Sequence, residues 1–288
     1  MPRAIEVAAL AAALAVAAVV AQPGRARAFD DSQYPDLHGQ WTRAPEGDSD
    51  EPRFDPGKPS GRAQEPPLTS EYQAIFEANL RDHEAGVPAV WPGPACLPPG
   101  MPAQMTAYRP LEFVVLPAIT YIRIDYVRDT RRRIYTDGRG WPAETEDGFD
   151  GYSIGRWIDE DGDGRYDVLA VETRHFKGPR LFDLSGIPLH EDNETVIRER
   201  IFLDKSDKDL LHDEMTVVDH ALTQPWTVLK SYRRAADPQP QWSEYICPWE
   251  TTTIRIGAEI YLTDKEGLLH PTRKDQPPPT LKYFSPRR

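Results

Sequence analysis

From Leu111 onward the chain is a series of short β-rich segments separated by turn signals, and this feature constrains the fold more than any other. Runs of β-branched and aromatic residues predict strands at 112–116, 121–128, 132–136, 152–158, 166–176, 194–205, 210–218, 226–233 and 241–247. Pairs such as Asp137-Gly138 and Asp147-Gly148 mark the connections. Because consecutive strands joined by short turns pair with their neighbours, the sequence predicts an antiparallel meander.

A single helix is predicted after residue 28, over residues 71–84. Its apolar side chains share one stripe, made of Tyr72, Ile75, Phe76 and Leu80. One helix cannot cover a sheet of this size, so the strands must close into a barrel or fold into a sandwich to protect their apolar face and edges. We predict a mainly β fold: an antiparallel meander closed into a barrel, with one short N-terminal helix and long Pro-rich loops.

Four regions follow from this interpretation. Residues 1–28 form a targeting segment, and residues 29–110 form an N-terminal arm that contains the first strand and the helix. The barrel spans 111–262, where 254–262 adds one further strand, and a Pro-rich tail occupies 263–288.

The amino-acid composition limits the classes of partner that the protein is expected to bind. The chain has 46 acidic and 34 basic side chains and a net charge of −12. This balance excludes a sequence-independent nucleic-acid binder, so we expect no nucleic-acid partner. Twelve Tyr, nine Phe and seven Trp are more aromatic residues than a disordered acidic chain carries, so a packed core is expected.

The first 28 residues have the pattern of a secretory signal peptide. Arg3 supplies a positive start, residues 7–20 form an apolar run too short to span a bilayer comfortably, and Ala26-Arg27-Ala28 offers a cleavage site. The alternative, an uncleaved anchor helix, is disfavoured by Pro23. We therefore expect a periplasmic or secreted protein without stable membrane insertion after cleavage.

Export affects how the two cysteines are interpreted. In an oxidising compartment, Cys96 and Cys247 most simply form one disulfide. Such a bridge closes a loop of roughly 150 residues, for which chain-entropy models give about 4–5 kcal/mol of stabilisation. The alternative is two buried free thiols.

The segment Asp36-Leu37-His38-Gly39-Gln40-Trp41 resembles the Gly-x-Trp opening of the calycin superfamily, the lipocalins and their relatives. In those barrels the glycine permits a bend in the first strand, and the tryptophan closes one end against an arginine from a late strand. The resemblance implies a calycin-like barrel here, with Arg233 or Arg234 as the partner of Trp41.

A longer resemblance is to a family of secreted, largely uncharacterised bacterial proteins that share Cys-Leu-Pro-Pro-Gly, Arg-Arg-Ile-x-x-Asp-Gly-Arg, Ser-x-Gly-Arg-Trp, Pro-Trp-Thr and Glu-Tyr-x-Cys segments. This chain carries them at 96–100, 132–139, 153–157, 225–227 and 244–247. The resemblance supports the pairing of Cys96 with Cys247 and brings no established reaction. The chain departs from its relatives at Trp141, where they often place a histidine, and in the longer segment 158–167.

That longer segment is similar to the first part of a calcium-binding loop. Carboxylates at alternate positions converge on one point, and a glycine at the sixth position allows a sharp turn. The proposed ligands are Asp159, Asp161, Asp163, the carbonyl of Arg165, and Asp167. The twelfth position is Ala170 rather than Glu, although Glu172 could reach in. The hypotheses are a structural Ca²⁺ site and a solvated acidic hairpin.

A second candidate cluster combines histidines with carboxylates: His175, Asp183, His190, Glu191 and Asp192. Histidine and carboxylate side chains can bind a transition metal or exchange protons. The alternative is that these are ordinary surface-loop histidines.

A third cluster is basic and consists of Arg128, Arg131, Arg132, Arg133 and Arg139, with Arg156 on the following strand. Guanidinium groups could hold a carboxylate or phosphate of a ligand, or they pair with the chain's own acids. Alternation also puts Tyr121, Arg123 and Asp125 on one face of a strand, where they line an interior or meet solvent. We assign ligand-binding roles to Tyr121, Arg123, Asp125, Arg133 and Tyr135.

The leading hypothesis from these features is an exported barrel that binds a small, partly apolar molecule in its lumen, without an organic cofactor. The alternative is a cofactor-independent lyase, isomerase or hydrolase in the same cavity. There His190 with Glu191 or Asp192 would exchange protons, and Arg133 or Arg156 would stabilise negative charge. A third hypothesis is an interaction protein whose arm and tail contact a partner.

Overall fold

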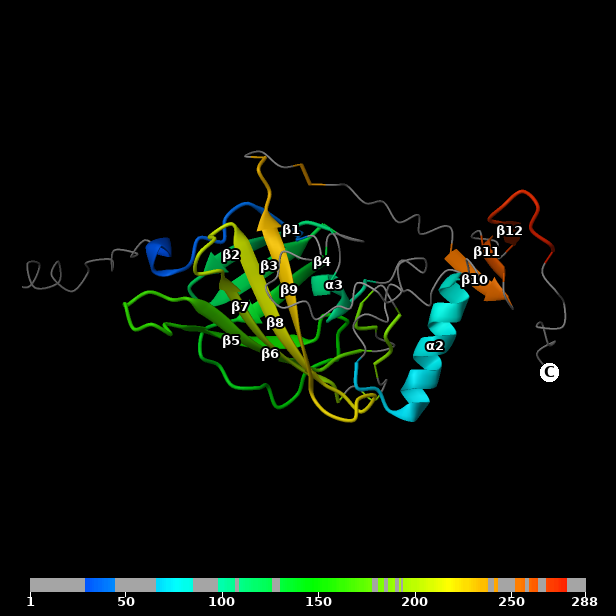
Figure 1. Cartoon of the computed structure of the whole chain (residues 1–288), viewed down its shortest axis with the longest axis horizontal. Coiled ribbons are helices and arrows are strands. Elements are labelled where there is room, and N and C mark those ends of the chain that lie inside the picture. The colour runs from blue at the N-terminus through cyan, green and yellow to red at the C-terminus, as the bar shows by residue number, and fades with distance from the viewer. Residues whose placement is uncertain are drawn as a thin grey trace, which may run out of the picture. The chain divides into compact units, whose positions relative to one another are not determined.

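The computed structural model describes residues 29–44, 66–84, 98–106, 109–125, 130–177, 181–183, 186–189, 192, 194–237, 241–242, 252–256, 259–263 and 268–278 (Figure 1). The chain divides into two compact units after Asp31, and the second unit, Ser32–Arg288, contains all the strands described below. A short 3-10 helix, Asp31–Gln33, lies at the boundary. None of the helices in the described part is long and apolar enough to cross a membrane.

Nine strands form a closed barrel, as predicted (Figure 1). They are β1 (Gln40–Arg43), β2 (Leu111–Leu116), β3 (Ile119–Ile124), β4 (Thr130–Tyr135), β5 (Tyr152–Ile158), β6 (Val168–Arg174), β7 (Val196–Leu203), β8 (Leu210–Val218) and β9 (Trp226–Arg234). Each strand pairs with the next along the chain, and β1 closes the barrel by pairing with β9 at Trp41 and Arg234. Closure leaves no exposed sheet edge.

One pair departs from the predicted antiparallel meander. Strands β4 and β5 are parallel, with Ile134 opposite Ser153 and Tyr135 opposite Ile154. The connection between them, residues 136–151, contains both of the Asp-Gly turn signals noted in the sequence, Asp137-Gly138 and Asp147-Gly148. Parallel strands need such a longer connection, whereas a two-residue turn joins antiparallel ones.

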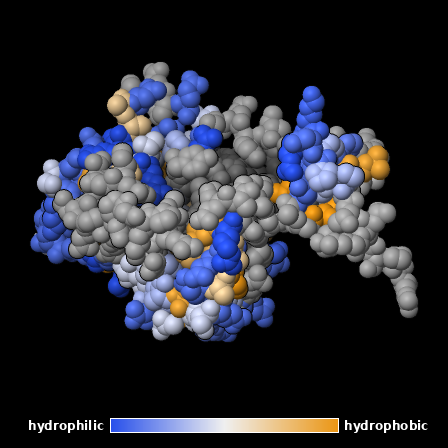
Figure 2. All heavy atoms as spheres, turned by 45° about the vertical axis from the view of Figure 1, so that its right-hand side comes forward, coloured by the Kyte–Doolittle hydropathy of each residue, from blue (hydrophilic) through white to orange (hydrophobic). Residues whose placement is uncertain are grey.

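Side chains alternate between the inside and the outside of the barrel, as strand geometry requires. On β8, for example, Leu211, Met215 and Val217 are buried in the core. The largest fully buried side chains include Trp41, Arg132, Tyr232, Phe176, Phe182, Met101 and Met105. The interior is therefore mainly apolar, with a few charged residues among the apolar ones. Hydrophilic residues cover most of the coloured surface in Figure 2.

Two α-helices are described. Helix α2 (Ser70–Glu84) matches the predicted helix, and Phe76 and Leu80 of its stripe join the core, while Ile75 is exposed. The Asn79 side chain donates a hydrogen bond to the carbonyl of Gly186 (2.8 Å). Helix α3 (Ala103–Thr106) was not predicted; it has four residues, all buried. Its neighbouring prolines hid so short a helix from periodicity arguments.

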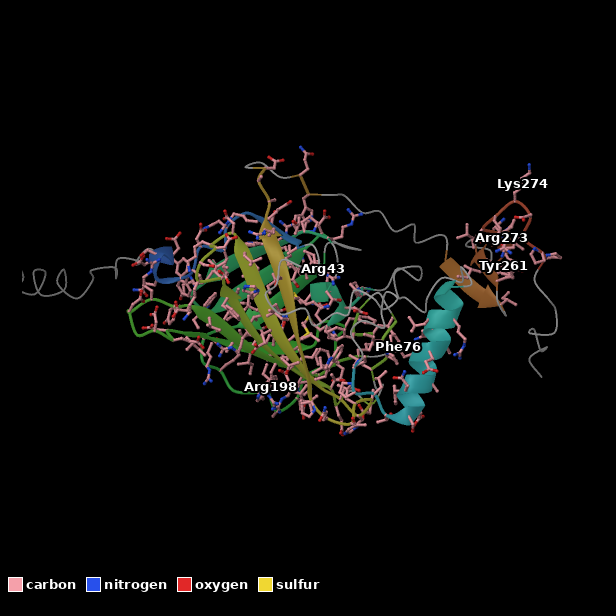
Figure 3. The ribbon with its side chains drawn as sticks, viewed as in Figure 1. Arg43, Phe76, Arg198, Tyr261, Arg273 and Lys274 are labelled. Atoms are coloured by element: carbon pink, nitrogen blue, oxygen red, sulfur yellow. The ribbon has the colours of Figure 1, made fainter. Side chains whose placement is uncertain are left out.

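The barrel ends earlier than predicted. Strands β10 (Thr252–Ile256), β11 (Glu259–Thr263) and β12 (Leu269–Pro271) form a separate three-stranded sheet. The segment 254–262 is therefore a hairpin rather than one more barrel strand, and part of the expected tail pairs with it. Residues 241–242 are not in a strand, and the rest of the strand predicted at 241–247 lies outside the described residues. Tyr261 is buried in this sheet, and Figure 3 labels it there.

Candidate functional site

Trp41 lies at one end of the barrel, opposite the first residue of β2 and the last residue of β9, and we call this region the closed end. Gly39 has a positive φ of 87°, which suits glycine and directs the chain into β1. The Trp41 side chain is fully buried, and its indole N–H donates to the carbonyl of Leu37 (3.0 Å). The guanidinium of Arg234 lies over the ring, 4.4 Å from its centroid. Of the two arginines considered, Arg234 is the partner of Trp41.

Arg234 also donates hydrogen bonds to backbone carbonyls around this end. Its donors bond to the carbonyls of Asp36 (2.8 Å) and His38 and to the carboxylate of Asp209 (2.8 Å). Both the indole and the guanidinium therefore have partners from the protein itself. This closed end is complete without another molecule.

The barrel interior contains an ion pair that reaches from β4 to β7. Arg132 donates two hydrogen bonds to Glu199, at 2.7 and 2.5 Å, and both side chains are 0% exposed. The remaining Arg132 bonds go to the hydroxyls of Ser153 (3.3 Å) and Thr173 (2.8 Å). Such a two-bond arrangement with hydroxyl support is what a buried charged pair needs to be tolerated.

Asp213 lies beside this pair and differs from it. Asp213 is on the inner face of β8, fully buried, directly opposite Lys230 of β9. Neither carboxyl oxygen has a hydrogen-bond partner among the described residues. Burial and then the charge of Glu199 hold the pKa of Asp213 well above its usual range, although Arg132 and Lys230 oppose this.

Tyr232 connects this region to helix α3. Its hydroxyl donates to the carbonyl of Met105, and burial, then the proximity of Asp213, raises the pKa of Tyr232. Arg43 of β1 donates to the next carbonyl, that of Thr106 (3.2 Å), and is labelled beside α3 in Figure 3. Gln104, which precedes Met105 in the same helix, is buried, and neither of its amide atoms has a partner among the described residues.

We call these side chains the interior polar cluster: Arg132, Glu199, Asp213, Lys230 and Tyr232. Its surroundings include the ring of Phe182, whose centroid lies 5.6 Å from Nζ of Lys230. Asp150 lies close enough to Arg132 to interact with it, and burial raises the pKa of Asp150 to about 6. The cluster can therefore offer both proton donors and acceptors inside an apolar barrel.

Sequence reasoning did not single out this cluster, although a signal exists. In each of three strands a charged residue occupies an inward position between apolar ones. Each charged residue stands two positions after a buried apolar residue on the same strand: Glu199 after Ile197, Asp213 after Leu211 and Lys230 after Val228. A charged residue in phase with an apolar alternation indicates an interior charge.

Most residues assigned to ligand binding lie elsewhere. Tyr121, Arg123, Arg133 and Tyr135 alternate with buried Ile122, Ile124, Arg132 and Ile134, so they face outward rather than into the barrel. Their contacts include neighbouring rings: Arg123 lies over Trp242 (4.4 Å) and Arg133 over Tyr121 (5.9 Å). Asp125 is buried just after β3. Within the basic group, Arg132 points inward.

Of the predicted catalytic residues, the structure describes Asp192 and Arg156. Arg156 is exposed on the outer face of β5. Asp192 is hydrogen-bonded to His220, which raises the pKa of His220, and Glu194 lies 3.8 Å from the other ring nitrogen. His190 and Glu191 lie outside the described residues. His175 approaches Asp147 instead (3.7 Å).

The acidic hairpin 158–167 has the compact form expected of its sequence. Oxygen atoms of Asp159, Asp161 and Asp167 lie within 4.8 Å of one another. Asp159 also accepts hydrogen bonds from the backbone of Gly162 (2.7 Å) and Gly164 (2.9 Å).

The other predicted members of the hairpin site are engaged elsewhere. Asp163 bonds the backbone N–H of Arg165 (2.8 Å). Glu172 pairs with Arg174 and Arg198 rather than reaching the hairpin. Three of the predicted acidic ligands could therefore share a cation.

The predicted disulfide of Cys96 with Cys247 and the predicted signal peptide 1–28 lie outside the described residues.

Comparison with known proteins assigned no family: no family model, no curated protein and no solved structure matches this chain.

Proposed function

We propose that this protein is an exported barrel that binds a small, partly apolar molecule at the interior polar cluster. Closed barrels of this size are suited to holding one small ligand, and their specificity comes from a few polar groups in an apolar interior. The cluster has that composition. Its charged residues stand between core side chains such as Ile201, Met215 and Val228.

The observation that carries this proposal is the state of Asp213. A buried polar group without a hydrogen bond costs about 1–3 kcal/mol. Asp213 has two such oxygens, and Gln104 adds an unpartnered amide nitrogen and oxygen. A bound molecule that bonds to these atoms would remove the cost, and its binding energy would include the recovered amount.

The Arg132–Glu199 pair has a different role in this proposal. Both Glu199 oxygens accept from Arg132, and Arg132 also bonds Ser153 and Thr173. These groups hold the interior in one arrangement and leave Asp213 as the carboxyl that meets the ligand. Asp213 is therefore the residue to test.

The test compares two substitutions on the same strand. Asp213→Leu removes the inward carboxyl, and Glu214→Leu removes its outward neighbour. The proteins are expressed with export, purified gently and weighed by native mass spectrometry. We expect an extra mass on the wild type and on Glu214→Leu but not on Asp213→Leu. A wild-type protein that carries no added mass, and gains none from a metabolite extract, contradicts the proposal.

A second candidate function is proton-transfer catalysis at the same place. Burial raises the pKa of Asp213 well above its usual range, which favours the protonated carboxyl that a general acid requires. In this version Asp213 takes the role that sequence reasoning gave to His190. Chemical conversion of the copurified molecule by the wild type, and not by Asp213→Leu, would favour a lyase, isomerase or hydrolase over a binding protein.

A further inference from the structure

The side chains of the interior polar cluster differ in whether their hydrogen-bonding atoms already have partners. Glu199 uses both oxygens on Arg132, and the Tyr232 hydroxyl donates to Met105. The carboxyl of Asp213 makes no such bond to any described residue. A ligand at the cluster must therefore have groups that can form hydrogen bonds with the Asp213 carboxyl.

The surroundings of Asp213 determine the form in which it meets a ligand. A carboxylate ion that is fully buried and accepts no hydrogen bond is strongly disfavoured, and a second carboxylate nearby disfavours it further. Glu199 is that second carboxylate, and it is paired with Arg132. Burial and the nearby Glu199 therefore favour the protonated form of Asp213, which presents one O–H donor beside one C=O acceptor.

A group that matches a neutral carboxyl has an acceptor and a donor side by side in one plane. Amides and lactams have this arrangement. An ammonium ion offers donors alone, and a carboxylate offers acceptors alone and adds a negative charge near Glu199. Gln104, in the helix whose Met105 carbonyl accepts from Tyr232, has an amide that likewise combines donor and acceptor atoms without partners among the described residues.

We propose that the ligand binds Asp213 through a neutral amide- or lactam-type group, which donates to one carboxyl oxygen and accepts from the other. This inference rests on the proposed function, since it names the chemical class of the molecule bound there. The apolar remainder of the ligand would contact the core side chains around the cluster, including Phe182.

The experiment uses Asp213→Asn beside Asp213→Leu in the full-length exported protein. Asparagine keeps a neutral donor and acceptor side by side, whereas leucine removes both. The probes are benzamide, benzoate and benzylammonium, which share one ring and differ in the head group. Binding is measured by saturation-transfer NMR and titration at neutral pH. Thermal unfolding confirms that each variant is folded.

We expect benzamide to bind the wild type at least tenfold more tightly than the two ions. Asp213→Asn should retain benzamide within about threefold, and Asp213→Leu should weaken it at least tenfold. Loss of binding in both variants, or preferred binding of either ion, would overturn the amide inference while leaving an interior ligand site. Benzamide binding, or retention of a copurified ligand, that is unchanged in Asp213→Leu would overturn the proposed site itself.

Discussion

Two regions of the same barrel bury polar side chains in opposite ways. At the closed end, the Trp41 indole and the Arg234 guanidinium find partners in the carbonyls of Leu37, Asp36 and His38. In the interior polar cluster, Asp213 is as fully buried as Trp41, and its oxygens have no partner among the described residues. The polar groups of the first region are satisfied within the fold, and we propose that those of the second bind another molecule. Unpaired buried groups thus mark where function is to be sought.

The largest expected effect comes from breaking the ion pair within the cluster. Arg132→Met leaves Glu199 buried without its partner, which should lower the free energy of unfolding by about 3–5 kcal/mol. Urea denaturation measures the change. The double variant Arg132→Met/Glu199→Leu removes both charges and should recover most of the loss. If the double variant is as unstable as the single one, the charged pair is not the source of the effect.

A smaller loss is expected at the closed end. Arg234→Met removes the bonds to backbone carbonyls and the contact with the Trp41 ring, so we expect a loss of about 2 kcal/mol. Ligand retention should not change, because the bonds and the ring contact that are lost belong to the closed end and do not involve Asp213. A measurable loss of bound ligand in a folded Arg234→Met protein would contradict the distinction between the two regions.

Asp213→Asn should change the free energy of unfolding in the opposite direction and stabilise the unliganded protein. The unfolded Asp213 ionises above its ordinary pKa of 3.8, while the folded form keeps its proton. Wild-type stability therefore falls as the pH rises from 3.8 toward the raised folded pKa, and each unit of that interval contributes about 1.4 kcal/mol.

Asparagine does not titrate, so the advantage of the variant should grow with pH across that window. The advantage should disappear below the unfolded pKa. Urea denaturation of ligand-free protein at several pH values measures this difference. An advantage that is the same at acidic and neutral pH would show that Asp213 does not take up a proton on folding.

The smallest effect is expected at the acidic hairpin. We propose that Ca²⁺ neutralises Asp159, Asp161 and Asp167, and that its addition after chelation raises the Tm by about 1–3 °C. Calorimetry should show binding to the wild type and not to Asp159→Asn/Asp161→Asn. The absence of both heat and a Tm change would favour the solvated hairpin, which its own backbone hydrogen bonds already hold together.

Much of the barrel could be predicted from sequence because strand alternation and turn residues are local signals. The strands 152–158 and 210–218 were predicted at their observed bounds. The resemblance of the segment around Gly39 and Trp41 to the calycin opening predicted a contact of Trp41 with Arg233 or Arg234, and Arg234 makes it. The parallel pairing of β4 with β5 could not be predicted, because it depends on the path of a long connection.

The interior polar cluster was missed for a related reason. Its members come from four strands and meet only when the barrel closes. Arg132 was noticed as part of a basic run, but one-residue alternation separates it from outward Arg133. The phase of alternation is fixed by tertiary packing rather than by the run itself. Charge clustering in sequence therefore pointed to the outer surface.

The most direct test of the central claim is an experimental electron-density map of the gently purified wild-type protein, inspected beside Asp213. We predict continuous density larger than a water molecule, with two polar atoms at about 2.6–3.2 Å from the Asp213 oxygens. An interior that holds only ordered water at Asp213, in crystals of protein that has been exposed to its native extract, would contradict the claim that this barrel is a binding protein.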